Sequence, residues 1–232
     1  MLSNDDFCDI LGLNDPKLDP SAVHPENPTN FTFLDLEMNQ PSGNIIQVGA
    51  VTGDVITGVV LEQLRLYVQV NEPLDPEISQ LTRITQAQLD EKGIPLIDAY
   101  KQVAAQHRRH NTWNSPVTWG GDDANYLLDR VFGQLGVGLT GANTKERLMS
   151  ELGVPWVFGR RSLDIKQVYQ IWGLANGHKM QGGLARCMTR LGMNFRGTKH
   201  DALDDSINTF RLTCALMGRL RGGLEVAKTL SP

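Results

Sequence analysis

Three apolar runs rich in β-branched residues constrain the fold more than any other feature of the sequence. They are FTFLDLEM (31–38), GNIIQVGAVTG (43–53) and GVVLEQLRLYVQV (58–70). Each run has the length of a strand, and short glycine-containing segments separate the runs. Successive strands that are joined by short turns pair in antiparallel fashion. We therefore expect residues 31–70 to form an antiparallel meander.

After Pro73 and Pro76 the pattern changes, and helices alternate with short strands. Two further strands are predicted at PVTWGG (116–121) and RRSLDI (160–165). Helices are predicted at ISQLTRI (78–84), at QAQLDEKG (86–93), from Pro95 to about Arg109, at DDANYLLDRVFGQLG (122–136), and near 165–173, 182–192 and 201–219. This order indicates an α/β fold in which a mixed sheet of about five strands is flanked by helices.

The length of the chain, 232 residues, is that of one substantial domain. Residues 1–30 carry many Asp, Asn and Pro residues and show no sustained hydrophobic period. We therefore expect a loop-rich extension over 1–30, a single domain over 31–220 and a C-terminal tail over 221–232.

The composition excludes a membrane protein and favours an ordinary globular domain. Hydrophobic residues make up 41% and charged residues 21% of the chain, which argues against wholesale disorder. No apolar run approaches the roughly 20 residues that a membrane helix needs. The acidic N-terminus lacks the basic region of a signal peptide. The cysteines are few and contain no CxxC motif, and Cys187 and Cys214 are predicted to be buried thiols, so we expect a reducing cytoplasm.

Charge is unevenly distributed along the chain, although the net charge is only −4. Residues 1–40 hold eight acidic residues against one base, whereas residues 151–200 hold eight bases against two acids. A chain with separate acidic and basic segments can bind a polyanion on one side without a basic overall charge. The alternative is that the bases form a solvated helix surface.

Two carboxylates, Asp35 and Glu37, lie in the middle of the first predicted strand, which we expect to be central in the sheet. Residues two apart in a strand project from the same face. Carboxylates in an apolar strand are costly to desolvate unless a cation neutralises them. Oxygen-rich sites of this kind suit Mg²⁺ or Mn²⁺.

Two later motifs supply further acids and a histidine. In WGGDD (119–123), Asp122 and Asp123 open a helix directly after a strand, where one of them is expected to cap the helix and the other to point toward the strand ends. In GTKHDALDDSINTFRL (197–212), His200 lies at or just before the start of a helix. The small residues of that helix, Ala202, Ser206, Thr209 and Thr213, are predicted to pack closely on the sheet.

The order of these motifs resembles that of the DEDDh 3′–5′ exonucleases. That family has Asp-x-Glu on its first strand, an Asp at a strand-to-helix junction, and His-x-x-x-x-Asp near its end. The likeness runs from about residue 31 to 217, and FLDLEMNQPSGNIIQVGAV, QLTRITQAQLD and SLDIKQVYQ resemble the family's first hairpin, the turn after its third strand and its fifth strand. The resemblance implies a ribonuclease H-like fold and release of nucleoside 5′-monophosphates from the 3′ ends of single-stranded RNA or DNA.

The resemblance also implies the metal ligands and the general base. Two divalent cations, Mg²⁺ or Mn²⁺, would be held by four carboxylates, and His200 would accept a proton from the attacking water. The implied ligands are Asp35, Glu37, Asp123 and Asp205. Asp205 is preferred to Asp204 because the family's Asp follows its His by five residues. Asp123 is preferred to Asp122 because its spacing to the apolar helix positions fits better.

By the same resemblance, a further set of residues would border the terminal nucleotide. These are Met38, Asn39, Arg83, Ile84, Thr85 and Lys199. Met38 could contact the base, but a buried methionine is an equal alternative. The segment ITQ (84–86) and the form WGGDD resemble the branch of the family that trims RNA more than the proofreading subunits, so RNA is slightly favoured over DNA.

Alternatives to a polymer-trimming exonuclease follow from the same motifs. One is a non-catalytic module that uses this fold to bind nucleic acid or protein, and another is a phosphodiesterase for short oligonucleotides. Homodimerisation is common among relatives, and recruitment would depend on a protein partner or on residues 1–30. GVGLTG (136–141) matches a dinucleotide-binding pattern but follows a helix, so we interpret it as a loop. The two histidines of HRRH (107–110) are predicted to lie at the exposed end of a helix.

Overall fold

The computed structural model describes residues 27–134, 153, 158 and 161–229, with side chains described as far as residue 220. Its sheet contains β1 (Asn30–Met38), β2 (Ile45–Asp54), β3 (Val60–Tyr67), β4 (Val117–Thr118) and β5 (Leu163–Asp164). The strand order is β3-β2-β1-β4-β5. The first three strands pair in antiparallel fashion, whereas β4 runs parallel to β1 and β5 parallel to β4. The mixed five-stranded sheet, with β1 at its centre, confirms the prediction.

The described helices occupy most of the predicted helical segments. They are α2 (Pro76–Thr82), α3 (Gln86–Lys92), α4 (Leu96–Arg109), α5 (Asp123–Gln134), α7 (Ile165–Ala175), α8 (Leu184–Arg190) and α9 (Ala202–Thr229). Helix α9 continues well beyond the predicted end near 219 and through most of the segment predicted as a tail. None of the helices in the described ranges is long and apolar enough to span a membrane. Most of the predicted extension over 1–30 and the GVGLTG segment (136–141) lie outside the described residues.

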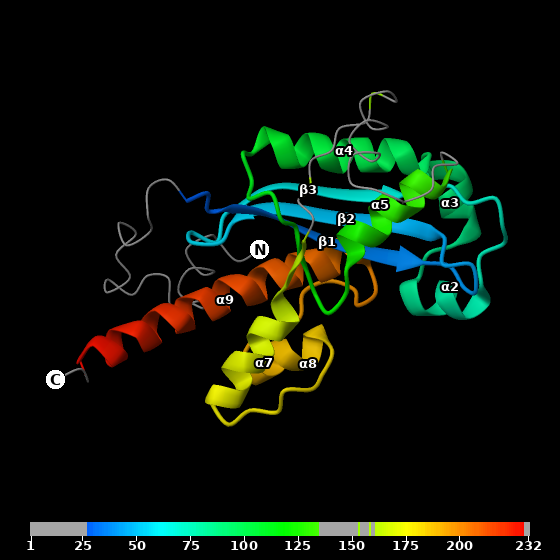
Figure 1. Cartoon of the computed structure of the whole chain (residues 1–232). Helices are drawn as coiled ribbons and strands as arrows, with labels where there is room; N and C mark the ends of the chain where they lie inside the picture. The colour runs from blue at the N-terminus through cyan, green and yellow to red at the C-terminus, as the bar shows by residue number, and fades with distance from the viewer. Residues whose placement is uncertain (1–26, 135–152, 154–157, 159–160, 230–232) are drawn as a thin grey trace.

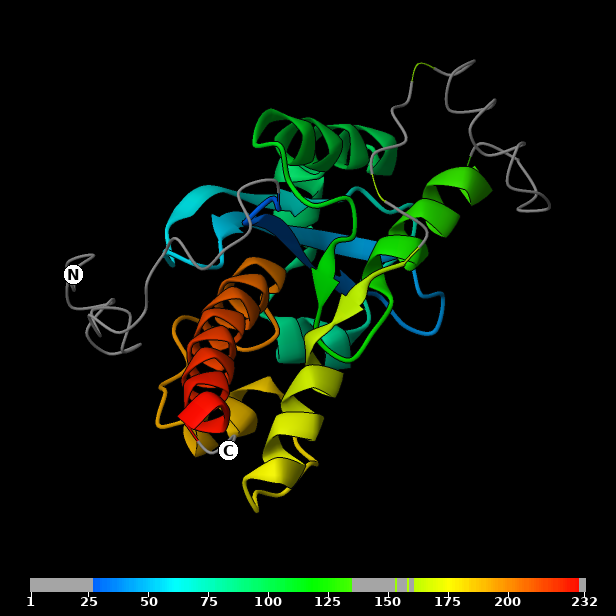
Figure 2. The same ribbon diagram turned by 60° about the vertical axis from the view of Figure 1, so that its left-hand side comes forward.

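The helices form a layer on each face of the sheet (Figures 1 and 2). Helices α4 and α5 cover one face, where Leu34 and Leu36 of β1 pack in the same core as Val103 and Leu127. Helix α9 covers the other face together with α7 and α8, and there Phe33 packs edge-on against Phe210. Cys187 and Cys214 are buried on this second side, as predicted.

Alternation along β1 decides which face receives the two carboxylates. Phe33 faces α9, so the period of two places Asp35 and Glu37 on the α9 side as well. Directly across the sheet, Gly49 of β2 pairs with Asp35, and Arg65 of β3 pairs with Gly49. The row from Asp35 to Arg65 therefore lies beneath the start of α9.

The start of α9 packs closely on β2 because Gly49 has no side chain. A Cβ on this glycine would lie 2.0 Å from the backbone carbon of Ala202. The Ser206 hydroxyl donates a hydrogen bond to the Gly49 carbonyl (3.0 Å). Ala202, Ser206, Thr209 and Thr213 are all buried, which confirms the prediction that this face packs on the sheet. The close approach fixes the height of the helix start above β1.

The prediction that both histidines of HRRH are exposed was wrong for His107. This residue lies near the end of α4 but is only 4% exposed. Its Nδ1 lies 2.9 Å from the Thr32 hydroxyl and 2.7 Å from the Thr112 hydroxyl, and its ring packs edge-on against Phe158. Burial, with a smaller contribution from Arg108, lowers the pKa of His107 to about 4.

We expect His107 to make the free energy of unfolding depend on pH. An unfolded histidine has a pKa of about 6.5, so between about pH 4 and 6.5 the unfolded state binds more protons than the folded state. Stability therefore falls as the pH drops through this window, by roughly 3 kcal/mol in total for this group. Urea unfolding at pH 7 and pH 4.5 should show a smaller drop for His107→Asn than for wild type. The matched control is His178→Asn, which removes an exposed imidazole. Equal drops for wild type and His107→Asn would contradict the prediction.

Candidate active site

A cavity of about 620 Å³ opens between β1, the start of α9, and helices α7 and α8. Asp35 and Glu37 line the cavity from β1. His200 lines it from the turn before α9, and Asp205 from the first turn of α9. The rest of its lining consists of Leu36, Trp119, Lys166, Gly183, Leu184, Ala185, Arg186, Phe195 and Lys199. Four of the five residues predicted to carry out catalysis therefore share one cavity.

The turn before α9 holds His200 in a left-handed conformation, with φ of 60°. Two helix carboxylates fix this turn: the His200 backbone N–H donates to Asp205 Oδ2 (3.0 Å), and the Thr198 N–H donates to Asp204 Oδ2 (2.7 Å). Gly197 also has positive φ, and a Cβ there would lie 2.3 Å from Asp204. The imidazole of His200 is consequently held over the cavity by its backbone and remains exposed.

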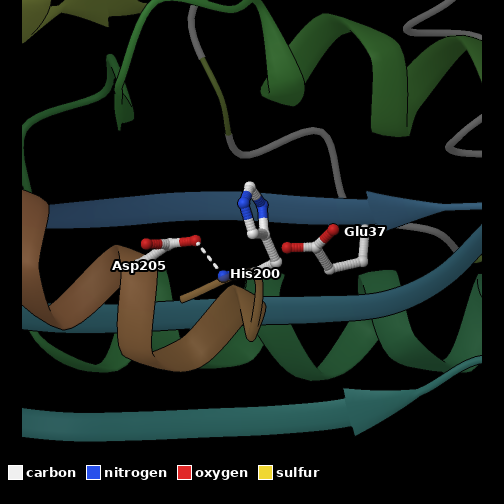
Figure 3. A group of neighbouring side chains, drawn as sticks. All are labelled: Glu37, His200 and Asp205. Carbon is white, nitrogen blue, oxygen red and sulfur yellow. Dashed lines mark hydrogen bonds between the residues drawn. The ribbon is translucent and has the colours of Figure 1, made fainter. Parts of the chain in front are cut away.

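Glu37, His200 and Asp205 converge, as Figure 3 shows. One donor atom from each lies within 4.8 Å of the other two. The three come from β1, the turn and α9, so this cluster exists only because α9 is docked on the sheet. Such a set of two carboxylates and an imidazole can hold a divalent cation.

The carboxylates of the cavity resist ionisation in the absence of a cation. Burial raises the pKa of Asp35 well above its ordinary range, and the charges of Asp123, Asp205 and Glu37 raise it further. Burial, followed by Asp205, raises the pKa of Glu37 to about 8. Burial likewise raises the pKa of Asp205 to about 6, although the His200 N–H opposes the rise. Burial and mutual repulsion thus favour the neutral form of these carboxyl groups, and a bound divalent cation would favour the ionised form.

The structure separates Asp123 from Asp122 by their surroundings. Burial, followed by the charges of Asp122 and Asp164, raises the pKa of Asp123 to about 7, and Asp123 in turn raises the pKa of Asp35 and Glu37. The two oxygens of Asp122 instead accept hydrogen bonds from the Ser162 hydroxyl (2.8 Å) and the Asn125 amide (2.7 Å). Asp123 thus belongs to the electrostatic cluster of the site, whereas Asp122 holds neighbouring chain segments together.

A similar division separates Asp205 from Asp204. Asp205 lines the cavity, whereas Asp204 Oδ1 accepts a hydrogen bond from the guanidinium of Arg65 (3.0 Å). Arg65 also contacts Asp201 through two nitrogens, at 2.9 and 3.1 Å. Of the adjacent acids, only Asp205 therefore has an oxygen that faces the cavity.

Three residues that position the site were missed by sequence reasoning: Gln47, Gly49 and Arg65. The buried amide of Gln47 donates to Asp201 Oδ2 (3.1 Å) and accepts from the Ala202 N–H (2.8 Å), so it ties β2 to the first turn of α9. Glutamine and arginine are common on strands, so the residue types of Gln47 and Arg65 did not indicate a role at the site. The period of two would have placed them on the face of Asp35 only if the strand register had been known.

The residues predicted to border the terminal nucleotide are not brought together at this cavity. Met38 packs with the core on the α4 and α5 side of the sheet. The Asn39 side chain is buried and holds the segment around Glu72 and Asp75. Ile84 is also buried, in a small core with Ile46.

Of the remaining predicted substrate contacts, Thr85 caps α3, and Lys199 lines the cavity itself. Arg83 lies in a second cavity of about 640 Å³, which adjoins the first because Lys199 and His200 line both. The role of each of these residues in substrate binding stays a prediction. Trp119 lies at the cavity wall, where it packs near Tyr169.

Several solved structures are similar to this chain. A full-length 3′-exonuclease superposes with a TM-score of 0.60 and 21% identity, over 85% of this chain and 62% of that chain. The nuclease domain of 3′hExo, a DEDDh family member bound to rAMP, superposes with a TM-score of 0.60 and 21% identity, over 86% and 95%. A structure of 3′-end specific recognition of histone mRNA stem-loop by 3′-exonuclease superposes with a TM-score of 0.59 and 20% identity, over 85% of this chain and 84% of that chain.

This chain shares its fold with these nuclease structures. The chain spans less than two thirds of the full-length 3′-exonuclease that it matches. No protein-family model and no curated protein sequence matches it. The likeness therefore rests on the arrangement of the elements, and the chemistry must be argued from the side chains at the site.

The donor set of the candidate site fits divalent cations. All four carboxyl groups have raised pKa values, with burial as the largest cause, and the charges of Asp123 and Asp205 raise the pKa of both Asp35 and Glu37. Oxygen ligands of this kind are preferred by Mg²⁺ and Mn²⁺. Asp35, Glu37, Asp123 and Asp205 would hold the cations, which would offset the charge that now raises the pKa values.

Proposed function

We propose that this chain is a metal-dependent 3′–5′ exonuclease that acts on single-stranded nucleic acid and releases nucleoside 5′-monophosphates. The observation that carries the proposal is the convergence of Glu37, Asp205 and His200 within 4.8 Å, in the cavity that also contains Asp35. A slight preference for RNA is favoured by the similar structures, one bound to rAMP and one of histone mRNA stem-loop recognition. Homodimerisation and recruitment through residues 1–30 stay predictions.

The proposed reaction is hydrolysis of the phosphodiester bond nearest the 3′ end. A water oxygen attacks phosphorus, the bond from phosphorus to the 3′ oxygen of the preceding nucleotide breaks, and that oxygen leaves with the shortened chain. Two divalent cations would stabilise the charge on the attacking and leaving oxygens of this in-line displacement. The four carboxylates would hold them in place.

His200 is suited to accept the proton of the attacking water. Its ring is exposed to the cavity, and its backbone N–H is held by Asp205, so the imidazole is positioned without using its own nitrogens. Histidine is also the side chain that most often serves as a general base in proton transfer.

We expect wild type to shorten a 5′-labelled single strand from its 3′ end in the presence of Mg²⁺ or Mn²⁺. EDTA should abolish cleavage because it removes the cations that would stabilise the charge on the attacking and leaving oxygens. His200→Ala should lower the rate by about 10²- to 10⁴-fold, the scale of a lost general base. Strands of RNA and DNA labelled at either end, resolved on a gel, give the direction and the preferred sugar.

His178→Ala is the control, because it removes an exposed histidine that stacks on Trp172 outside the cavity lining. Bound but uncut strands with wild type would contradict the exonuclease proposal and favour a non-catalytic binding module on the same fold. Cleavage restricted to the shortest oligonucleotides would instead favour the phosphodiesterase alternative.

A further inference from the structure

The lining of the catalytic cavity contains a cationic part in addition to its carboxylates. Lys166 from the first turn of α7, Arg186 from α8 and Lys199 from the turn before α9 all face it. Lys199 belongs to the residues already predicted to contact substrate, whereas no role follows from the proposed reaction for Lys166 or Arg186. Both come from elements that carry none of the predicted metal ligands.

Lys166 is positioned by the turn that leads into α5. Gly120 in this turn has φ of 74°, and a Cβ on it would lie 2.8 Å from Lys166 Cδ and 3.0 Å from Lys166 Nζ. The Lys166 and Gly120 backbone N–H groups both donate to Asp164 Oδ1, at 2.9 and 2.8 Å. The lysine side chain therefore lies across the turn between β4 and Asp123 and reaches the cavity from there.

Neither cation forms an ion pair with the acids of the cavity. Among the described residues, the salt bridges involve Arg65, Lys101, Arg109 and His110, and not Lys166 or Arg186. By contrast, the neighbouring Arg190 is used structurally, because its guanidinium donates to the carbonyls of Lys179 and Gln181. Positive charges that share a cavity with several carboxylates, yet remain apart from them, are available to an anionic ligand.

We infer that Lys166 and Arg186 form a binding site for the phosphate immediately on the 5′ side of the scissile phosphate. The inference rests on the proposed function and deepens it. The scissile phosphate must lie at the carboxylates and His200, so a second phosphate of the same strand is the anion that can occupy the cationic part of the cavity. Lysine and arginine bind phosphate through charge-assisted hydrogen bonds. This site would make the enzyme prefer substrates that carry at least two phosphodiester linkages.

The test compares the RNA dimer ApA with the trimer ApApA, both with free 5′ hydroxyls. The dimer has only the scissile phosphate, whereas the trimer adds the phosphate that the site would bind. With Mg²⁺ or Mn²⁺, wild type should cut the trimer with a kcat/KM at least about tenfold above that for the dimer, as charge-assisted contacts allow. In the double variant Lys166→Met and Arg186→Met, this ratio should fall to about one, whatever the absolute rates. The wild-type ratio should also shrink as salt is raised.

The matched control removes the same two charges from α4, on the opposite face of the sheet, by Lys101→Met and Arg108→Met. This control should keep the wild-type ratio. A wild-type ratio near one, or a ratio that survives in the Lys166 and Arg186 variant, overturns the inference while the exonuclease proposal stands. If wild type cuts neither substrate nor longer strands, the proposed function falls and the inference falls with it.

Discussion

Asp205→Asn is expected to lower the rate of 3′-end hydrolysis by at least about 10³-fold, the scale of losing a group that acts directly on transition-state charge. The substitution keeps the size of the side chain and an oxygen that can accept the His200 N–H. It removes the negative charge that helps to hold a cation within reach of Glu37 and His200. The fold should be retained, because asparagine can still hold the turn before α9.

The adjacent acid provides the matched control for this prediction. Asp204→Asn removes the same charge one residue away, where the carboxylate holds Arg65 and the Thr198 N–H outside the cavity. We expect its effect on rate to stay within the about 10- to 100-fold that supporting residues of metal sites show. Single-turnover cleavage with saturating Mg²⁺ or Mn²⁺, alongside thermal unfolding, compares the two. A larger loss for Asp204→Asn than for Asp205→Asn would reverse the assignment of the metal ligand.

The same reasoning applies to the pair at the start of α5. Asp123 raises the pKa of Asp35 and Glu37, whereas Asp122 is engaged by Ser162 and Asn125. Asp123→Asn should therefore resemble Asp205→Asn in rate, and Asp122→Asn should resemble Asp204→Asn. Together, the variants of Asp204 and Asp205 and those of Asp122 and Asp123 test which aspartate of each pair is the metal ligand. The sequence alone supports that choice only by likeness to the family.

Gly49→Ala is expected to impair both stability and activity, although it adds only one methyl group. The new Cβ would lie 2.0 to 2.2 Å from backbone atoms of Ala202 and Leu203, so either β2 or the start of α9 must move. Overpacking of this kind costs about 1–3 kcal/mol or more. The movement also carries Asp205 and His200 away from β1, and a misplacement of about 1 Å can cost about 10²-fold in rate.

Urea unfolding and cleavage assays test this prediction together. Gly133→Ala is the control, because Gly133 lies in α5 and a Cβ there meets nothing within 4 Å. In a helix, alanine is more stable than glycine by about 0.5–1 kcal/mol, so this control should be neutral or stabilising. Gly49→Ala with wild-type stability and rate would mean that α9 does not depend on the close approach described above.

Much of the fold could be predicted because its elements have strong local patterns. The three β-rich runs at the start of the domain, and the helical period of the segment from Pro95 to Arg109, gave elements that differ from the structure by only a few residues at their ends. The end of α9 was predicted too early, since the segment beyond 219 lacks a strong apolar period. His107 was misplaced because its neighbours in HRRH are charged, whereas Thr32 and Phe158, which bury it, are distant in sequence.

The candidate site also contains residues that could be predicted from the sequence and residues that could not. Asp35 and Glu37 were predictable because carboxylates in an apolar strand are costly unless they serve a purpose. The roles of Gln47, Gly49 and Arg65 were not predictable, because each depends on strand register and on where α9 starts. For Lys166 and Arg186, the sequence indicated only that they belong to a basic segment, and not that they face the cavity.

The sequence by itself determined the order of strands and helices and the chemical types available for a metal site, because local period, turn residues and side-chain chemistry are properties of short segments. Only the tertiary structure showed that Asp205 lines the cavity whereas Asp204 contacts Arg65, and which residues pack around them. The physical reason is that charge and burial act through space: Asp205 and Asp204 are neighbours in sequence, but one faces Glu37 and His200 while the other faces Arg65.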